Sequence, residues 1–303
     1  MNIQNIKKPQ VAIMNAVHDL PVLVARDEGF FKDEGLDLDF VTTPGMAQVT
    51  TSHLVKFDSI FDRPLDSVYN EGGIDQFRMC EWGIMKRAVE ARSEGLRSRK
   101  IVALGASMSK FALVVAGNSD VYEPEMLKNK AIAVTPNNGS HFTTLKMMEG
   151  FVEPKYVKTT HSGSMLKRLE AVRDGKVTAA SVMEPWISVA QKWGLRILIE
   201  SHSTRSEAAG DDLDGPTLKK MFRAQTRAVE LLAKDPKPYI HYLIAETGGL
   251  LEPHELHTWR LLHAPPQPYT RERFDDTYNW NVKWNMTVPG ATYDNTVDNR
   301  AWE

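Results

Sequence analysis

Short apolar runs alternate with amphipathic stretches along the first two thirds of the chain, and this alternation limits the fold more than any other feature. Pro9 to Met14 reads as a buried strand, and Leu36 to Val41 as a second strand. Between them, Leu20 to Phe31 is predicted as a helix with Asp19 as its N-cap. This strand–helix–strand unit is the seed of an α/β fold.

The alternation of strands and helices continues to about residue 200. Further strands are predicted at 74–79, 100–105, 111–116, 131–134, 156–160, 179–183 and 195–200. The chain from residue 218 onward is predicted to be mainly helical, with helices at 218–233, 238–247, 253–262 and 271–285. The chain is therefore expected to be an α/β protein with a helical C-terminal segment.

In open α/β sheets, ligands bind beyond the carboxyl ends of strands, where loops lead into helix N-termini. This rule selects the candidate ligand-contacting stretches directly from the predicted strands. They are 18–19, 80–82, 137–141, 162–164, 184–186 and 201–203.

Composition excludes several classes of protein. The 303 residues carry 37 Lys plus Arg and 39 Asp plus Glu, a net charge of −2, which gives no nucleic-acid footprint. A single cysteine excludes a disulfide framework, and no run of eighteen apolar residues predicts a membrane span. His254 and His257 have metal-compatible spacing but no third ligand nearby, so no metal or other cofactor is expected. The N-terminus lacks a signal-peptide pattern, which predicts a cytoplasmic protein, or a periplasmic one if a signal has been removed.

The order of several loose motifs resembles the solute-binding proteins of nitrate, sulfonate and taurine transporters. These motifs are VHDLPVLVARDEGFFKDEGLDLDF, GGIDQFRMCEWG, AIAVTPNNGSHFTTLKMM, DGKVTAASVMEPW and LLAKDPKPYIHYLIAETGG, and together they cover nearly the whole chain. The resemblance implies the two-lobed type II periplasmic-binding-protein fold, with hinge closure over a small-molecule ligand and an ABC permease as partner. The expected lobes are 1–110 plus 203–303, and 111–202.

Two enzyme groups share that fold. The thiamine-pyrimidine synthases carry a Lys and a His in the loop after the second motif and a cysteine-rich run, whereas this chain has MCEWG there and one Cys. The aryl sulfinate desulfinases place a nucleophilic cysteine in the first strand–helix loop, where this chain has His18. They also carry an Arg-x-Gly-Gly motif, and Asn70 to Gly73 keeps only its glycines. The catalytic mechanism of neither enzyme group is therefore predicted for this chain.

The stretch Asn137-Asn138-Gly139-Ser140-His141 opens a predicted helix after a strand. Free backbone N–H groups and the helix dipole favour an anion there, such as a sulfonate, carboxylate or phosphate. Capping of the helix by Asn or Ser explains the same residues. In the first loop, His18 is expected to contact a ligand and Asp19 to orient it or to cap the helix.

Cys80 is predicted to begin the loop after the strand that ends at Met79, directly before a helix. A helix N-terminus lowers a thiol pKa, but the neighbouring Glu81 raises it, and free cysteines are usually inert and buried. Cys80, Glu81 and Trp82 are therefore candidate ligand contacts.

Glu184 and Trp186 belong to the Glu-Pro-Trp stretch that the family places at its cleft. Trp82 and Trp186 could face each other and hold a flat ligand, or could be ordinary hinge packing. The segment 42–73 is longer than the family leads us to expect, and it is predicted either to cover the cleft or to be a surface elaboration.

Two functions of different classes follow. The leading prediction is a binder of a small anionic or heteroaromatic molecule. The alternative is a cofactor-independent cytosolic hydrolase, decarboxylase or C–S lyase on the same fold, with His18, Cys80 and Glu81 as its catalytic set.

Overall fold

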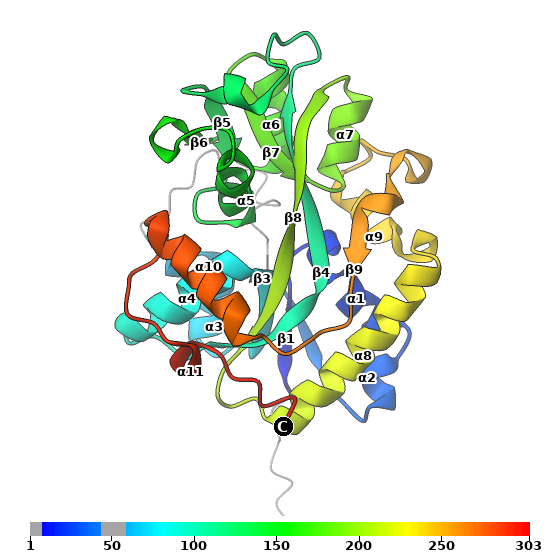
Figure 1. Ribbon diagram of the computed structural model, residues 1–303. Coiled ribbons are helices and arrows are strands. Elements are labelled where there is room, and N and C mark those ends of the chain that lie inside the picture. The colour runs from blue at the N-terminus through cyan, green and yellow to red at the C-terminus, as the bar shows by residue number, and fades with distance from the viewer. Residues whose placement is uncertain (1–7, 44–58) are drawn as a thin grey trace, which may run out of the picture.

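The computed structural model describes residues 8–43 and 59–303 and shows a mixed α/β protein built on one twisted sheet (Figure 1). Within these residues the strand order is β2-β1-β3-β8-β4-β7-β5-β6, and β9 pairs with β4. The strands are β1 (Gln10–Ile13), β2 (Asp39–Thr42), β3 (Gln76–Cys80), β4 (Lys100–Val115), β5 (Ala131–Val134), β6 (Lys158–His161), β7 (Ala179–Met183), β8 (Arg196–Ala209) and β9 (Leu261–His263).

The helices cover both faces of this sheet (Figure 1). They are α1 (Ala16–Asp27), α2 (Phe30–Asp33), α3 (Pro64–Asn70), α4 (Glu81–Ser93), α5 (Gly139–Met148), α6 (Met165–Arg173), α7 (Trp186–Lys192), α8 (Gly215–Lys234), α9 (His241–Glu246), α10 (Arg271–Lys283) and α11 (Tyr293–Thr296). The predicted α/β class with a largely helical C-terminal segment is confirmed. Over the described ranges, none of these helices is long and apolar enough to cross a membrane.

Two long antiparallel strands form the centre of the sheet. β4 has 16 residues and β8 has 14, and their pairing runs from Lys100 opposite Ala209 to Val115 opposite Arg196. Three register shifts interrupt this ladder, which lets the pair twist and bend. The parallel strands β1, β2 and β3 lie at one end of the pair, and the parallel strands β5, β6 and β7 at the other (Figure 1).

The central strands were predicted as shorter pieces. The sequence analysis divided β4 into two strands, at 100–105 and 111–116, and ended β8 at Glu200. Ser107, Ser109 and Ser203 look like loop residues in sequence, but they are buried within continuous strands. Local β-propensity does not predict these strand segments, because the pairing of β4 with β8 determines their conformation.

Two predicted helices also differ from the structure. The first helix begins at Ala16 rather than Leu20, because the Asn15 side chain accepts a hydrogen bond from the His18 backbone N–H and caps the helix four residues earlier. The predicted helix at 253–262 does not form. It is replaced by two short 3₁₀ turns, Pro253–Glu255 and Thr258–Arg260, followed by β9. Its apolar residues pair with β4 instead of forming a helical stripe.

An aromatic cluster joins helices from the two ends of the molecule. Trp82 of α4 stacks on Phe142 of α5 with 6.4 Å between ring centroids, and contacts Trp280 of α10 at 5.6 Å. Trp284 extends the cluster from Trp280 at 5.7 Å. The Trp280 indole N–H also donates to Glu149 Oε2 at 3.1 Å, so both packing and a hydrogen bond hold α10 against the α5 region.

We expect Trp280→Ala to lower the free energy of unfolding by about 3–5 kcal/mol, the usual cost of emptying a large aromatic site. Trp259→Ala is the matched control, because Trp259 is 57% exposed whereas Trp280 is 7% exposed. Urea unfolding followed by far-UV circular dichroism measures both. Equal effects of the two substitutions would show that the aromatic cluster is not a structural contact.

Candidate functional site

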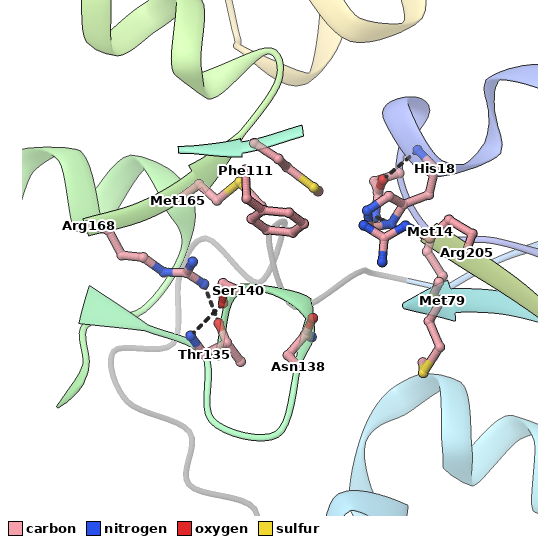
Figure 2. A pocket seen from close by; sticks show the side chains of 12 residues that line it. Met14, His18, Met79, Phe111, Thr135, Asn138, Ser140, Met165, Arg168 and Arg205 are labelled. Atoms are coloured by element: carbon pink, nitrogen blue, oxygen red, sulfur yellow. Dashed lines mark hydrogen bonds between the residues drawn. The ribbon is translucent and has the colours of Figure 1, made fainter. Parts of the chain in front are cut away.

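A small cavity of about 50 Å³ lies where the two sets of parallel strands approach each other across β4 and β8. Met14 and Met79 come from the carboxyl ends of β1 and β3, and Thr135 and Met183 from those of β5 and β7. This convergence is the geometry expected of a ligand site in an α/β sheet. The remaining lining residues are Asn15, His18, Phe111, Asn138, Ser140, Met165, Arg168 and Arg205 (Figure 2).

Arg205 on β8 brings a buried charge to this cavity. The residue is 1% exposed, and its Nε donates to Ser109 Oγ at 3.2 Å. Among residues 8–43 and 59–303, its Nη2 has no hydrogen-bond partner. Burial lowers the pKa of the guanidinium to about 10, and the nearby Cys80, Asp19 and Glu81 only partly offset this. A guanidinium with an unused donor, buried away from water, favours an anionic partner.

His18 on α1 supplies a second unused donor beside Arg205 (Figure 2). Asn15 Oδ1 accepts from the His18 backbone N–H at 3.1 Å, so the Asn15 amide group donates to His18 Nδ1 at 2.8 Å. This pairing assigns the ring proton to Nε2, for which the described part of the chain offers no hydrogen-bond partner. Burial, together with the positive charges of Arg205 and Arg78, lowers the His18 pKa well below its ordinary value. At neutral pH the ring is therefore an uncharged N–H donor.

Asp19, the neighbour of His18, organises the loop that carries it. Its carboxylate accepts from the backbone N–H groups of Met14 at 2.6 Å and Asn15 at 3.0 Å, and from Arg78 Nη1 at 2.5 Å. Arg78 is in turn held by Glu207 at 3.2 Å. Because Asn15 both caps α1 and fixes the His18 tautomer, this buried network sets the direction of the His18 donor.

Arg168 on α6 places a second buried guanidinium at the cavity. It donates from Nε to Gly163 O at 3.3 Å, from Nη1 to Ser181 O at 2.8 Å, and from Nη2 to Thr135 Oγ1. All three acceptors are neutral, and burial lowers the Arg168 pKa to about 9. The side chain connects α6 to β7 and to the loops after β5 and β6, and none of these contacts is with a carboxylate.

The N-terminus of α5 adds further positive potential. The Asn138 side chain caps the helix, and Ser140 Oγ accepts from the Thr135 backbone N–H at 3.0 Å. A Cβ added at Gly139 would lie 3.1 Å from Phe111 and 3.5 Å from Arg205 Nη1, so a larger residue there would require Phe111 to shift slightly. The positive end of a helix dipole thus faces a buried guanidinium, which is unfavourable unless an anion lies between them.

The structure brings together only some of the residues selected from the sequence. His18, Asn138 and Ser140 line the cavity, and Gly139 packs directly behind it. Asn137 and His141 face each other instead, because the His141 Nδ1 accepts from the Asn137 backbone N–H at 3.1 Å.

Two members of the predicted catalytic set, Cys80 and Glu81, lie at the junction of β3 and α4 and make structural contacts. Glu81 accepts from Arg273 Nε at 2.7 Å and Nη2 at 2.9 Å, and it is 5% exposed. Cys80 is buried, and burial raises the pKa of its thiol. Trp82 belongs to the aromatic cluster described above. These contacts provide neither a thiolate nor an unpaired carboxylate for catalysis.

Glu184 and Trp186 lie away from the lining side chains. Glu184 accepts from Ser188 Oγ at 3.1 Å and from Arg260 Nη1 at 3.2 Å, while Trp186 packs into the main hydrophobic core. Burial raises the Glu184 pKa to about 7, against the opposing effect of Arg260. The two tryptophans, 82 and 186, belong to different clusters and do not form a sandwich.

The sequence analysis missed both arginines, and one of them left a readable signal. Met165, Arg168, Leu169 and Val172 follow the i, i+3, i+4, i+7 spacing of a buried helical stripe. An arginine on such a stripe must be buried and needs partners. Arg205 follows two serines and a threonine in a stretch that reads as a loop, so its burial could not be inferred.

A metal site is not indicated. Within the ranges 8–43 and 59–303, no three His, Cys, Asp or Glu side chains are arranged to hold a metal ion. His254 lies in one 3₁₀ turn and His257 outside it, so the helix that would align them is missing.

Comparisons with known proteins identify the fold. No family model matches the chain, and no curated protein sequence matches it either. Among solved structures, it resembles the periplasmic aliphatic sulphonate binding protein SsuA of Escherichia coli, with a TM-score of 0.71 at 14% identity over 96% of this chain and 92% of that one. The periplasmic nitrate-binding protein NrtA of Synechocystis gives a TM-score of 0.73 at 13% identity, over 98% and 88%.

A third similar structure is the CA3427 gene product of Candida albicans, described as exhibiting the generic periplasmic binding protein structural fold. Its TM-score is 0.71 at 12% identity, over 97% of each chain. The chain has the periplasmic-binding-protein fold. Identities this low establish the fold alone, so the function must be argued from the cavity.

The raised pKa of Glu184 predicts a pH effect on stability. Folded protein keeps a proton up to about pH 7 that the unfolded chain releases near its ordinary pKa of 4.5. Stability should therefore fall as pH rises between these values, by on the order of 3 kcal/mol. Glu184→Gln removes this titration.

The measurement is urea unfolding of both proteins from pH 4.5 to 8. We expect the wild-type curve to decline relative to the Glu184→Gln curve across this range, since all other titrating groups are shared. Parallel curves would mean that Glu184 is ionised throughout.

Proposed function

We propose that this protein binds a small anion in the cavity between the ends of its parallel strands. The observation that carries the proposal is the pair of unused buried donors, Arg205 Nη2 and His18 Nε2. Buried donors in native proteins almost always have partners, and a charged one left alone is particularly costly. Arg168, Asn138 and Ser140 add further donor groups around the same space.

The similar structures support this proposal. Two of them are proteins that bind an aliphatic sulphonate and nitrate, and both ligands carry an oxyanion group. By analogy, we propose that the chain is a solute-binding protein that delivers its ligand to an ABC permease, and that it acts in the periplasm as those proteins do. The enzyme alternative receives no comparable support, because Glu81 is paired with Arg273 and the Cys80 pKa is raised.

We further propose that the molecule works as two lobes, 1–110 plus 203–303 and 111–202, which close over the ligand by a hinge motion. Both boundaries fall inside the central pair β4 and β8, which connects the two ends of the molecule (Figure 1).

Of the segment 42–73, which was predicted either to cover the cleft or to be a surface elaboration, residues 44–58 lie outside the described part of the chain. Arg63, which follows them, donates to the backbone O atoms of Pro136 and Asn137 at 2.7 and 3.0 Å.

Isothermal titration calorimetry with nitrate, methanesulfonate, ethanesulfonate and sulfate tests the binding proposal. We expect at least one anion to bind, and Arg205→Gln to raise its Kd by at least about 30-fold, as for loss of a buried charged donor. Arg173→Gln is the matched control, since that side chain is 54% exposed. Thermal unfolding of each variant shows that it is folded.

Recovery of the ligand after prolonged incubation separates a binder from an enzyme. We expect mass spectrometry to find the anion unchanged. Consumption of the anion, or binding that survives Arg205→Gln unaltered, would overturn the proposal.

A further inference from the structure

We infer that the natural ligand of this cavity carries two anionic groups joined by a short apolar spacer. This inference rests on the proposed function and specifies the class of anion. Its basis is a count of buried positive charges and the placement of two of them around the cavity.

Most buried arginines of this protein have a carboxylate partner. Arg78 contacts Asp19 and Glu207, and Arg260 contacts Glu200 at 2.8 Å. Two further buried arginines near α3 also have a carboxylate partner. Arg87 and Arg99 both contact Asp66, at 2.9 and 3.0 Å. Countercharge is thus the normal way in which this protein buries a guanidinium.

Arg168 and Arg205 depart from that rule. Each is 1% exposed, and among the described residues neither forms an ion pair with a carboxylate. Both line the same cavity. Arg63 also lacks a carboxylate but donates to two backbone carbonyls outside the lining. Two guanidiniums at the cavity therefore have no carboxylate in direct contact among the described residues, and a ligand with two anionic groups could pair with each of them.

The two guanidiniums lie on opposite sides of Phe111 (Figure 2). Arg205 is grouped with the His18 donor, and Arg168 with Thr135 and Ser140. One compact ion cannot neutralise both sides equally. Two separate anionic groups, one for each donor set, match this arrangement.

Apolar side chains make up part of the cavity lining. Phe111 lies between the two guanidiniums in Figure 2, and the lining also includes four methionines, Met14, Met79, Met165 and Met183. Methionine side chains adapt their shape to apolar surfaces and bind them without directional bonds. The cavity of about 50 Å³ corresponds to the space of a few water molecules, which suits a small ligand. A short dicarboxylate or sulfocarboxylate has the required chemistry.

A matched ligand pair tests the inference. Sulfoacetate and ethanesulfonate have similar length and the same sulfonate head, but only sulfoacetate carries a second anionic group. We expect calorimetry at pH 7.5 to show sulfoacetate binding at least 30-fold more tightly, because a site built for two polar groups disfavours a ligand that lacks one. Malonate and propionate form a second pair with carboxylate heads.

Arg168→Gln assigns the second anionic group to its donor set. We expect this variant to weaken sulfoacetate at least 10-fold and ethanesulfonate less than 3-fold, so that the preference for the dianion is lost. Arg173→Gln, on the same helix but exposed, should leave both affinities unchanged. Arg205→Gln, in contrast, should weaken both ligands.

The ratio of the sulfoacetate and ethanesulfonate affinities of the wild-type protein tests the inference even if Arg168→Gln fails to fold. Equal or tighter binding of ethanesulfonate overturns the inference while leaving the proposed anion-binding function intact. A dianion preference that Arg168→Gln keeps in folded protein also overturns it. Absence of binding by every anion tested would defeat both the inference and the proposed function.

Discussion

The antiparallel pairing of β4 with β8 is the constraint on which the rest of this structure depends. It is the connection through which the parallel strands at one end of the sheet meet those at the other (Figure 1). It also sets Phe111 opposite Ser201 and Ser109 opposite Ser203, so that Ser109 can hold the Nε of Arg205. The cavity exists because these central strands carry its side chains past the carboxyl ends of β1, β3, β5 and β7.

Around that frame, buried charge is arranged in two different ways. Asp19 and Glu207 neutralise Arg78, and the same Asp19 carboxylate holds the loop whose Asn15 orients His18. Arg205 and Arg168, by contrast, are held by neutral acceptors, and no carboxylate among the described residues pairs with either. Under the proposed function, a site whose donors are already positioned binds its anion with little cost of rearrangement.

The sequence predicts the fold well and the site only in part. Alternating apolar runs and helices identify the α/β class, and the strand-end rule finds His18, Asn138 and Ser140 at the cavity. It cannot show that residues 201–209 continue β8, because this stretch is mostly Ser, His, Arg, Glu and Ala, which carry little strand signal until the pairing with β4 buries them. Asp19 is expected from the sequence to orient His18 or to cap a helix, and Glu81 to contact a ligand, but Arg78 and Arg273, distant in sequence, pair with them.

The central claim is that an anion occupies the space between Arg205 and His18. Nitrogen-15 NMR of the histidine rings tests it most directly, with a His18→Gln variant to assign the signal. The account predicts that free His18 is the neutral tautomer with its proton on Nε2, and that a bound anion shifts this Nε2–H signal strongly. A bound anion that leaves the His18 signal unchanged would contradict the account.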